Sequence, residues 1–262
     1  MNRKSLLKRV SSKILGYFPS TILNKLISKK FKSFHYPVVL MFHRVIPDNY
    51  MKTYADTFGY EVSELAPFSV TPEKLEEIIV LLKENGFSFL FEDEYQKSKA
   101  KQIILTFDDG YTDNYLFAYP ILRKHGVKAS INIISGKLCD DDKGEFLSIG
   151  RVLEMQNSNL IQFQAHTISH PVLTQCTRDV CRREIVDCKK MIYEKTGIMA
   201  SVFVYPCCQM NREISEWVKQ NYLMAYGGND KETEFIYRIP RIEINANFDK
   251  KKLLSNMYFS II

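Results

Sequence analysis

Two adjacent carboxylates, Asp108 and Asp109, follow a short apolar stretch and precede Gly110. Adjacent side chains at the end of a strand point in different directions. The pair therefore suits two separate tasks, in which one carboxylate binds a metal ion and the other moves a proton. An ordinary Asp-Gly turn is the simpler interpretation, and it would be preferred if the pair stood alone.

Two histidines four residues apart, His166 and His170, lie further along the chain. Because Pro171 follows the second, a loop that folds both imidazoles toward one point fits better than one face of a helix. With Asp109 they would offer two nitrogens and one carboxylate oxygen, which leaves positions open for water and substrate as a catalytic zinc-type site requires. A pair of surface or capping histidines is the alternative, since short histidine spacing is a weak motif on its own.

The elements that must position these residues are strands that alternate with helices. Buried strands are predicted at residues 37–42, 87–91, 102–107, 127–134, 160–165, 201–205 and 223–226, with an extended stretch at 236–244. Helices are predicted at residues 71–86, 113–125, 149–155, 177–195 and 214–220, with a short one after Asp249. Residues 44–70 are predicted to be a long irregular loop. The alternation indicates parallel βαβ units and an α/β fold.

Residues that could take part in catalysis or metal binding directly follow several of these strands. His43, the carboxylate pair, His166 and Pro206 all fall at the carboxyl ends of predicted strands. Parallel α/β barrels build their active sites at that end of the strands. The agreement between the strand pattern and this placement predicts an enzyme.

Length and charge predict one domain with an extension. The chain has 262 residues, 45% of them hydrophobic and 25% charged, as in ordinary globular proteins. Its net charge is +6, but residues 1–34 alone carry nine cationic and no acidic side chains, so the remainder is about −3. We therefore predict an extension at 1–36 and a domain at 37–262. Since the basic charge lies in the extension, no nucleic-acid partner is expected.

The extension has an amphipathic pattern. Ile22, Leu26, Ile27 and Phe31 recur at helical spacing, with lysines off that face. Such a helix can lie on an anionic membrane, so peripheral membrane contact through residues 1–34 is one prediction, and packing of its apolar side on the barrel is the other. No apolar core of a signal peptide is recognisable, because cations interrupt the stretch.

The six cysteines lack the paired spacing of a zinc site or an evident disulfide framework. Cys181 and Cys188 are expected to pack inside a helix, and adjacent Cys207 and Cys208 are poor disulfide partners. Together with the missing export signal, these thiols favour a cytoplasmic location, which is also compatible with the inner membrane face.

The stretch from Leu105 to Gly110, taken with His166-Thr167-Ile168-Ser169-His170, resembles the polysaccharide deacetylases of the NodB-like, carbohydrate esterase 4 group. The resemblance extends over roughly residues 37–245 and implies a distorted (β/α) barrel of roughly seven strands. It also implies that Asp108 is the general base, and that Asp109, His166 and His170 hold the metal.

A third motif of that group is present in part. Tyr205-Pro206-Cys207 resembles the segment whose backbone amide after the proline binds the oxyanion, so the resemblance assigns this role to Cys207. Tyr111, Tyr205 and Pro206, which adjoin these motifs, are predicted to contact the substrate. The arginine that would orient Asp108 is missing from the motif, and Arg238 or Arg241 is a candidate replacement.

The general acid is implied by a more specific resemblance. The stretch from Val39 to Arg44 is similar to the first strand of the circularly permuted poly-N-acetylglucosamine deacetylase branch, in which the histidine after the strand is the acid. This resemblance assigns the role to His43, since the C-terminal region has no histidine. A strand-end histidine that is hydrogen-bonded in the core is the alternative.

The family resemblance implies a metal-dependent hydrolase that removes N-acetyl groups from an amino-sugar polysaccharide or a lipid-linked glycan precursor. The expected cofactor is a divalent metal, zinc in the first place, with cobalt or nickel as alternatives. Two other functions remain open: an O-acetyl esterase or small cyclic amidase with the same site, and a non-catalytic carbohydrate-binding scaffold. The sequence does not predict the oligomeric state.

Overall fold

The computed structural model describes residues 37–96, 99, 101–249, 253 and 257. Its strands are β1 (Val38–Phe42), β2 (Arg44–Val45), β3 (Ser69–Val70), β4 (Ser88–Phe89), β5 (Gln102–Asp109), β6 (Ala129–Ile133), β7 (Ile161–Ala165), β8 (Val202–Val204), β9 (Met224–Tyr226) and β10 (Ile242–Glu243). Its α-helices are α3 (Met51–Phe58), α4 (Val62–Leu65), α5 (Pro72–Glu84), α6 (Tyr119–His125), α7 (Ile149–Asn157), α8 (Arg178–Thr196) and α9 (Arg212–Asn221).

Short helical turns complete the described elements. The 3-10 turns are Ala66–Phe68, Glu92–Glu94, Ser135–Lys137, Leu173–Gln175, Pro206–Cys208 and Phe235–Tyr237. A π-helical turn, Asn114–Ala118, precedes α6. The helix predicted at 113–125 is thus present, but it is divided into two types of turn.

A parallel sheet of eight strands forms the centre of the molecule, in the order β10-β1-β5-β6-β7-β8-β9, with β4 beside β5. The sheet curves into a distorted barrel. At its open side, Ile239 bridges to Tyr226 of β9, and three residues later β10 pairs with β1 through Leu40 and Ile242. One short segment therefore joins the two ends of the sheet, and the predicted barrel is confirmed.

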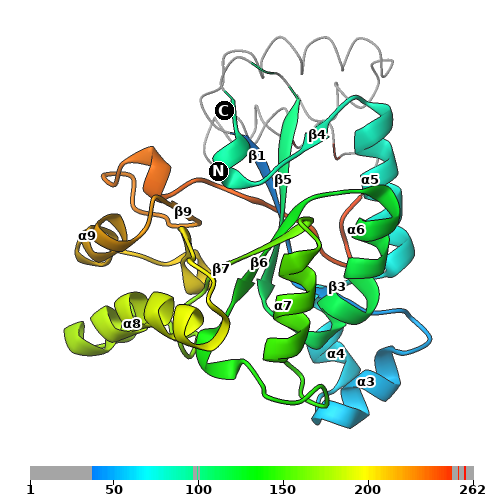
Figure 1. Ribbon diagram of the computed structural model, residues 1–262, viewed down its shortest axis with the longest axis horizontal. Helices are drawn as coiled ribbons and strands as arrows, with labels where there is room; N and C mark the ends of the chain where they lie inside the picture. Colours follow the sequence, from blue (N-terminus) through cyan, green and yellow to red (C-terminus); the bar gives the residue numbers. More distant parts are fainter. Residues whose placement is uncertain (1–36, 97–98, 100, 250–252, 254–256, 258–262) are drawn as a thin grey trace, which may run out of the picture.

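Strands β1, β5, β6, β7 and β8 are almost entirely buried, as expected of a parallel sheet covered by helices. Outward-facing side chains form one large core with the helices, and a smaller core fills the barrel. The inner core includes Val39, Ile104, Val202, Val204 and Tyr226. In Figure 1, α8 and α9 lie to the left of the central strands and α5 and α6 to their right.

Local sequence signals explain where the helices begin and end. The Thr71 hydroxyl accepts a hydrogen bond from the Lys74 amide, and Pro72 occupies the first turn of α5. Asn211 caps α9 in the same way through the Ile214 amide. Gly197 ends α8 in the left-handed conformation that glycine adopts without strain. These boundaries agree with the predicted helices within a few residues.

The prediction for residues 44–70 is wrong. This stretch contains α3, α4, a 3-10 turn and the small parallel sheet of β2 and β3. Ile46, Tyr54, Ala55 and Leu65 form a separate apolar cluster inside it. Figure 1 shows α3 and α4 together at one edge of the molecule, near β3. We call residues 46–70 the helical insert.

The structure confirms the prediction for the cysteines and leaves the predictions for the two ends of the chain untested. Cys181 and Cys188 are buried in α8, and all six cysteines are free thiols. The extension at 1–36 lies outside the described residues, as does most of the helix predicted after Asp249. The predicted stretch at 236–244 is only partly extended, because a 3-10 turn occupies its start. Within the described part of the chain, none of the helices combines the length and apolarity needed to cross a membrane.

Candidate active site

A pocket of about 510 Å³ opens at the carboxyl ends of the strands. It collects side chains from distant parts of the sequence, among them His43 after β1, the carboxylate pair of β5, and His166 after β7. Parallel strands bring their carboxyl ends to one edge, so residues far apart in sequence meet there. The predicted meeting of these residues in one place is what the structure shows.

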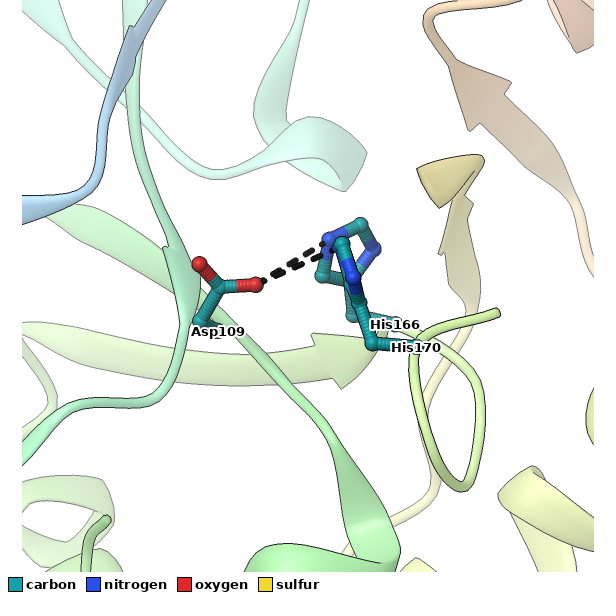
Figure 2. A group of neighbouring side chains, drawn as sticks. All are labelled: Asp109, His166 and His170. Carbon is teal, nitrogen blue, oxygen red and sulfur yellow. Dashed lines mark ion pairs between the residues drawn. The ribbon is translucent and has the colours of Figure 1, made fainter. Parts of the chain in front are cut away.

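Asp109, His166 and His170 form a compact group of potential metal ligands (Figure 2). The Oδ1 atom of Asp109 lies 3.5 Å from Nε2 of each histidine, and the potential ligand atoms all lie within 4.8 Å of one another. The His166 ring is oriented by its Nδ1 atom, 2.9 Å from the carbonyl oxygen of Val204. With Nδ1 as donor, Nε2 carries the free lone pair that faces the other two residues.

The group fits a divalent cation. Oδ1 of Asp109 is buried and has no hydrogen-bond partner among the described residues, which is costly unless a cation or water satisfies it. Burial lowers the pKa of His166, which favours the neutral imidazole that binds metals. Two imidazole nitrogens and one carboxylate oxygen match the donor set of catalytic zinc sites with open positions.

The backbone around this group is held in unusual conformations. Asp109, Thr167 and His170 all have positive φ, which costs a residue with a side chain about 1 kcal/mol or more. Such angles persist only where neighbouring structure enforces them. Gly110 also has positive φ, and a Cβ at its position would lie 2.8 Å from Cγ2 of Ile133. The strand end that carries the carboxylates therefore requires glycine next to it.

The loop between the histidines is anchored by Glu184 of α8. Its carboxylate accepts hydrogen bonds from the amides of Ile168 and Ser169 at 2.8 and 2.9 Å, and from the Ser169 hydroxyl at 2.7 Å. The Thr167 hydroxyl also accepts from the His170 amide at 2.9 Å. These contacts fix the loop that brings the second imidazole to Asp109. The sequence analysis did not identify Glu184, because a glutamate in a helix gives no signal of such a partner.

Asp108 points to a different set of partners. Nη1 and Nη2 of Arg241 donate to its two carboxylate oxygens at 2.7 Å each, and the Asn132 amide donates to Oδ1 at 2.7 Å. Burial would raise the pKa of Asp108, but the charge and hydrogen bonds of Arg241 hold it well below its usual range. Of the two candidate arginines, Arg241 thus lies at Asp108, whereas Arg238 donates to the Thr233 carbonyl.

His43 lines the same pocket, at the end of β1. Its ring packs edge-on against Phe68, with 5.8 Å between the ring centroids. It is near enough to interact electrostatically with Asp108. The structure therefore brings His43 to the carboxylates, where a group that exchanges protons with the substrate would lie.

The Tyr205-Pro206-Cys207 segment borders the pocket. Cys207 and Cys208 line it, and both have positive φ. Tyr111 and Tyr205 line it as well, and the Tyr205 hydroxyl is buried without a hydrogen-bond partner among the described residues. Pro206 is buried and is not among the lining residues, and its contact with substrate stays a prediction. It shapes the turn that presents Cys207.

Arg44 is a second buried arginine that the sequence analysis did not single out. Its guanidinium pairs with Asp113 and Glu145 and donates to the Tyr54 hydroxyl. Its Cζ atom also lies over the ring of Tyr111, 3.4 Å from the centroid. Burial raises the pKa of Asp113 to about 6, although Arg44 opposes this shift. Arg44 thereby ties the helical insert to the wall of the pocket.

Comparison with known proteins agrees with this architecture. A sequence model described as polysaccharide deacetylase matches residues 95–226. The chain belongs to the polysaccharide deacetylase family. YxkH of Bacillus subtilis (strain 168), assigned as a polysaccharide deacetylase, is 28% identical over 197 residues, which cover 71% of this chain and 69% of YxkH.

The poly-beta-1,6-N-acetyl-D-glucosamine N-deacetylase of Staphylococcus aureus (strain MSSA476) is 30% identical over 138 residues. The match covers 50% of this chain and 47% of that enzyme, so it spans about half of the enzyme's length. Among solved structures, the deacetylase PplD of Streptococcus pyogenes, in complex with acetate, is 26% identical with a TM-score of 0.69 and covers 84% of this chain and 97% of PplD.

IcaB from Ammonifex degensii has a TM-score of 0.66, and the match covers 84% of this chain and 96% of IcaB. At 16% identity, this likeness shows the shared fold alone. The family and the barrel predicted from the sequence are both confirmed.

Proposed function

We propose that this polysaccharide deacetylase is a metal-dependent enzyme that removes N-acetyl groups from an amino-sugar polysaccharide or a lipid-linked glycan precursor. The observation that carries the proposal is that the two adjacent carboxylates, Asp108 and Asp109, have different partners. Asp109 faces two imidazoles at 3.5 Å, whereas Asp108 is bound on both oxygens by Arg241 at 2.7 Å. Two carboxylates that served only to form a turn would not need two separate sets of side-chain partners.

In this proposal Asp109, His166 and His170 hold the cation, with zinc as the first choice and cobalt or nickel as alternatives. When bound, a divalent ion supplies Lewis acidity that polarises an acyl carbonyl and makes water a better nucleophile. Asp108 accepts the proton of the attacking water. Arg241 keeps this carboxylate ionised and fixes its orientation, so that it is ready to act as the base.

The other groups act on the developing charges of the amide. The backbone N–H after Pro206, that of Cys207, would donate a hydrogen bond to the oxyanion. His43 would give a proton to the leaving amine nitrogen, since an amine departs far more easily once protonated. Tyr111 and Tyr205 would contact the substrate from the walls of the pocket. The free amine and acetate are the products.

The name of the Staphylococcus aureus relative supports an N-acetylated glucosamine polymer as the substrate class. Membrane contact through residues 1–34 and a location at the cytoplasmic face stay predictions. No nucleic-acid partner is proposed. An O-acetyl esterase would use the same site, so the nature of the product distinguishes the two reactions.

The test is acetate release from β-1,6-linked N-acetylglucosamine oligomers by purified protein supplied with zinc, cobalt or nickel. We expect one free amine for every acetate released, and loss of more than 99% of the rate in Asp108→Asn. Asp140→Asn, at an exposed aspartate that does not line the pocket, is the matched control and should keep the rate. Acetate release without amine formation would support the esterase, and full activity of Asp108→Asn would contradict the assigned base.

A further inference from the structure

The helical insert forms one wall of the pocket. Tyr60, Glu64, Leu65 and Phe68 all come from this insert, and all four line the pocket. The remaining lining residues lie outside the insert, and they include every residue with a proposed catalytic or metal-binding role. This division indicates that the insert contributes to recognition of the substrate and not to the reaction itself.

Phe68 is the exposed aromatic residue of this wall. Its side chain is 51% exposed, although it lines a pocket beside a buried site. Ligand pockets are lined mainly by apolar and aromatic side chains, so an exposed ring in a pocket lining can contact a ligand. Leu65, by contrast, is turned into the apolar cluster of the insert. Phe68 is thus available to a ligand in a way that its apolar neighbour is not.

The backbone holds Phe68 firmly in register with His43. Arg44 pairs with Ser69 in the small parallel sheet, so the residues that precede them, His43 and Phe68, lie side by side. The Ser69 hydroxyl donates to the Leu65 carbonyl at 2.8 Å, which closes the turn that carries Phe68. The two rings meet edge to face, with an interplanar angle of 68° and 5.8 Å between centroids. The position of the ring relative to His43 is therefore fixed by backbone pairing.

The size of the pocket points to a ligand larger than an acetyl group. Its volume of about 510 Å³ lies within the range of roughly 300–1,000 Å³ that encloses a drug-sized molecule. The same lining contains the metal-ligand group, Asp108 and the exposed apolar ring of Phe68. A pyranose ring has the matching shape, since its C–H groups form an apolar face while its hydroxyls point outward.

We propose that Phe68 is a substrate-positioning residue that stacks on the apolar face of a pyranose ring of the glycan. This inference rests on the proposed function and names the residue that recognises the sugar. Stacking on Phe68 would place the ring beside His43, so that the amide nitrogen of the sugar comes within reach of the imidazole. A substrate without a ring would lose this contact but could still reach the metal site.

The experiment compares Phe68→Ala, Phe68→Trp and the control Val62→Ala with the wild type. Val62 belongs to the same insert and is 39% exposed, but it does not line the pocket. Each protein is assayed for acetate release from an N-acetylglucosamine hexamer and from vinyl acetate, an activated ester with no ring. Binding of the hexamer is measured by calorimetry in an Asp108→Asn background, so that it does not depend on turnover.

We expect Phe68→Ala to weaken hexamer binding about tenfold and to lower the ratio of hexamer to vinyl acetate activity by a similar factor, through KM. Phe68→Trp should recover most of both values, and Val62→Ala should match the wild type. Unaltered hexamer binding in Phe68→Ala would overturn the inference. An equal loss on both substrates would also overturn it, because Phe68 would then act through His43. Failure of the wild type to release acetate from any glycan, with hexamer binding still dependent on Phe68, would instead contradict the proposed function.

Discussion

Replacement of Arg241 by methionine tests how much the stability of the protein depends on the buried ion pair between Arg241 and Asp108. The two side chains are each 3% exposed, and two hydrogen bonds of 2.7 Å join them. Removal of one partner leaves a buried carboxylate without a counter-charge, which typically costs about 3–5 kcal/mol. We therefore expect Arg241→Met to lower the free energy of unfolding by about 3–5 kcal/mol at pH 7, measured by urea denaturation with bound metal removed.

The pH dependence of this loss has a definite sign. In the wild type the pKa of Asp108 lies below its unfolded value, so its ionisation contributes stability above the unfolded pKa and loses it as the pH falls through the folded pKa. Arg241→Met removes the largest contribution that lowers this pKa while burial still raises it, so the variant gains stability relative to the wild type as the carboxyl becomes protonated. The difference between the two proteins should shrink from pH 7 toward pH 4.

Two further variants test whether the loss of stability comes from the unpaired buried carboxylate. Asp108→Asn combined with Arg241→Met removes both charges and should recover part of the loss, because no carboxylate is left unpaired. Arg178→Met is the matched control, since Arg178 pairs with Glu213 at 2.7 Å on the surface, with side chains 74% and 51% exposed. Its loss should stay below about 1 kcal/mol. A loss of less than about 1 kcal/mol in Arg241→Met, or one that does not change with pH, would refute the reasoning.

Two other predictions concern the backbone around the ligands. Glu184→Gln replaces one of the two carboxylate oxygens that accept from three donors by an NH2 group that cannot accept, so zinc affinity in a chelator competition should fall by roughly 10- to 100-fold. Exposed Glu194→Gln on the same helix should leave the affinity unaltered. Equal affinities would show that the loop does not depend on Glu184. Gly110→Ala should cost about 2–3 kcal/mol in thermal or urea unfolding, from its positive φ and the Ile133 contact at 2.8 Å. Gly59→Ala, also at positive φ but with nothing within 4 Å, should cost about 1 kcal/mol, and a similar cost at both sites would rule out the steric contribution.

The meeting of Asp109 with His166 and His170 could be predicted from the sequence. Asp109 ends one recognisable buried strand, and His166 directly follows another and begins the loop that contains His170. Parallel strands place their carboxyl ends at one edge. The partner of Asp108 could not be chosen in the same way. Arg241 reaches it because Ile242 pairs with Leu40 in a two-residue strand, and so short a strand leaves almost no hydrophobic pattern.

The helical insert was missed for a related reason. Its α3 has eight residues and α4 only four, so neither is long enough to show a clear helical period. Their stability comes from tertiary contacts, including the hydrogen bond from Arg44 to the Tyr54 hydroxyl at 2.8 Å. Such contacts join residues whose proximity depends on the completed fold. The exposure of Phe68 at the pocket is likewise a property of the folded chain.

The proposed mechanism is tested most directly by the metal content and the activity of two neighbouring variants, Asp108→Asn and Asp109→Asn. In this mechanism the adjacent carboxylates have separate tasks, one as a base and the other as a metal ligand. Both proteins are loaded with zinc, freed of excess metal, and assayed for bound zinc and for acetate release from N-acetylglucosamine oligomers. We predict that Asp108→Asn retains about one zinc per chain without activity, and that Asp109→Asn loses both. Loss of zinc from Asp108→Asn, with zinc retained in Asp109→Asn, would contradict the central claim.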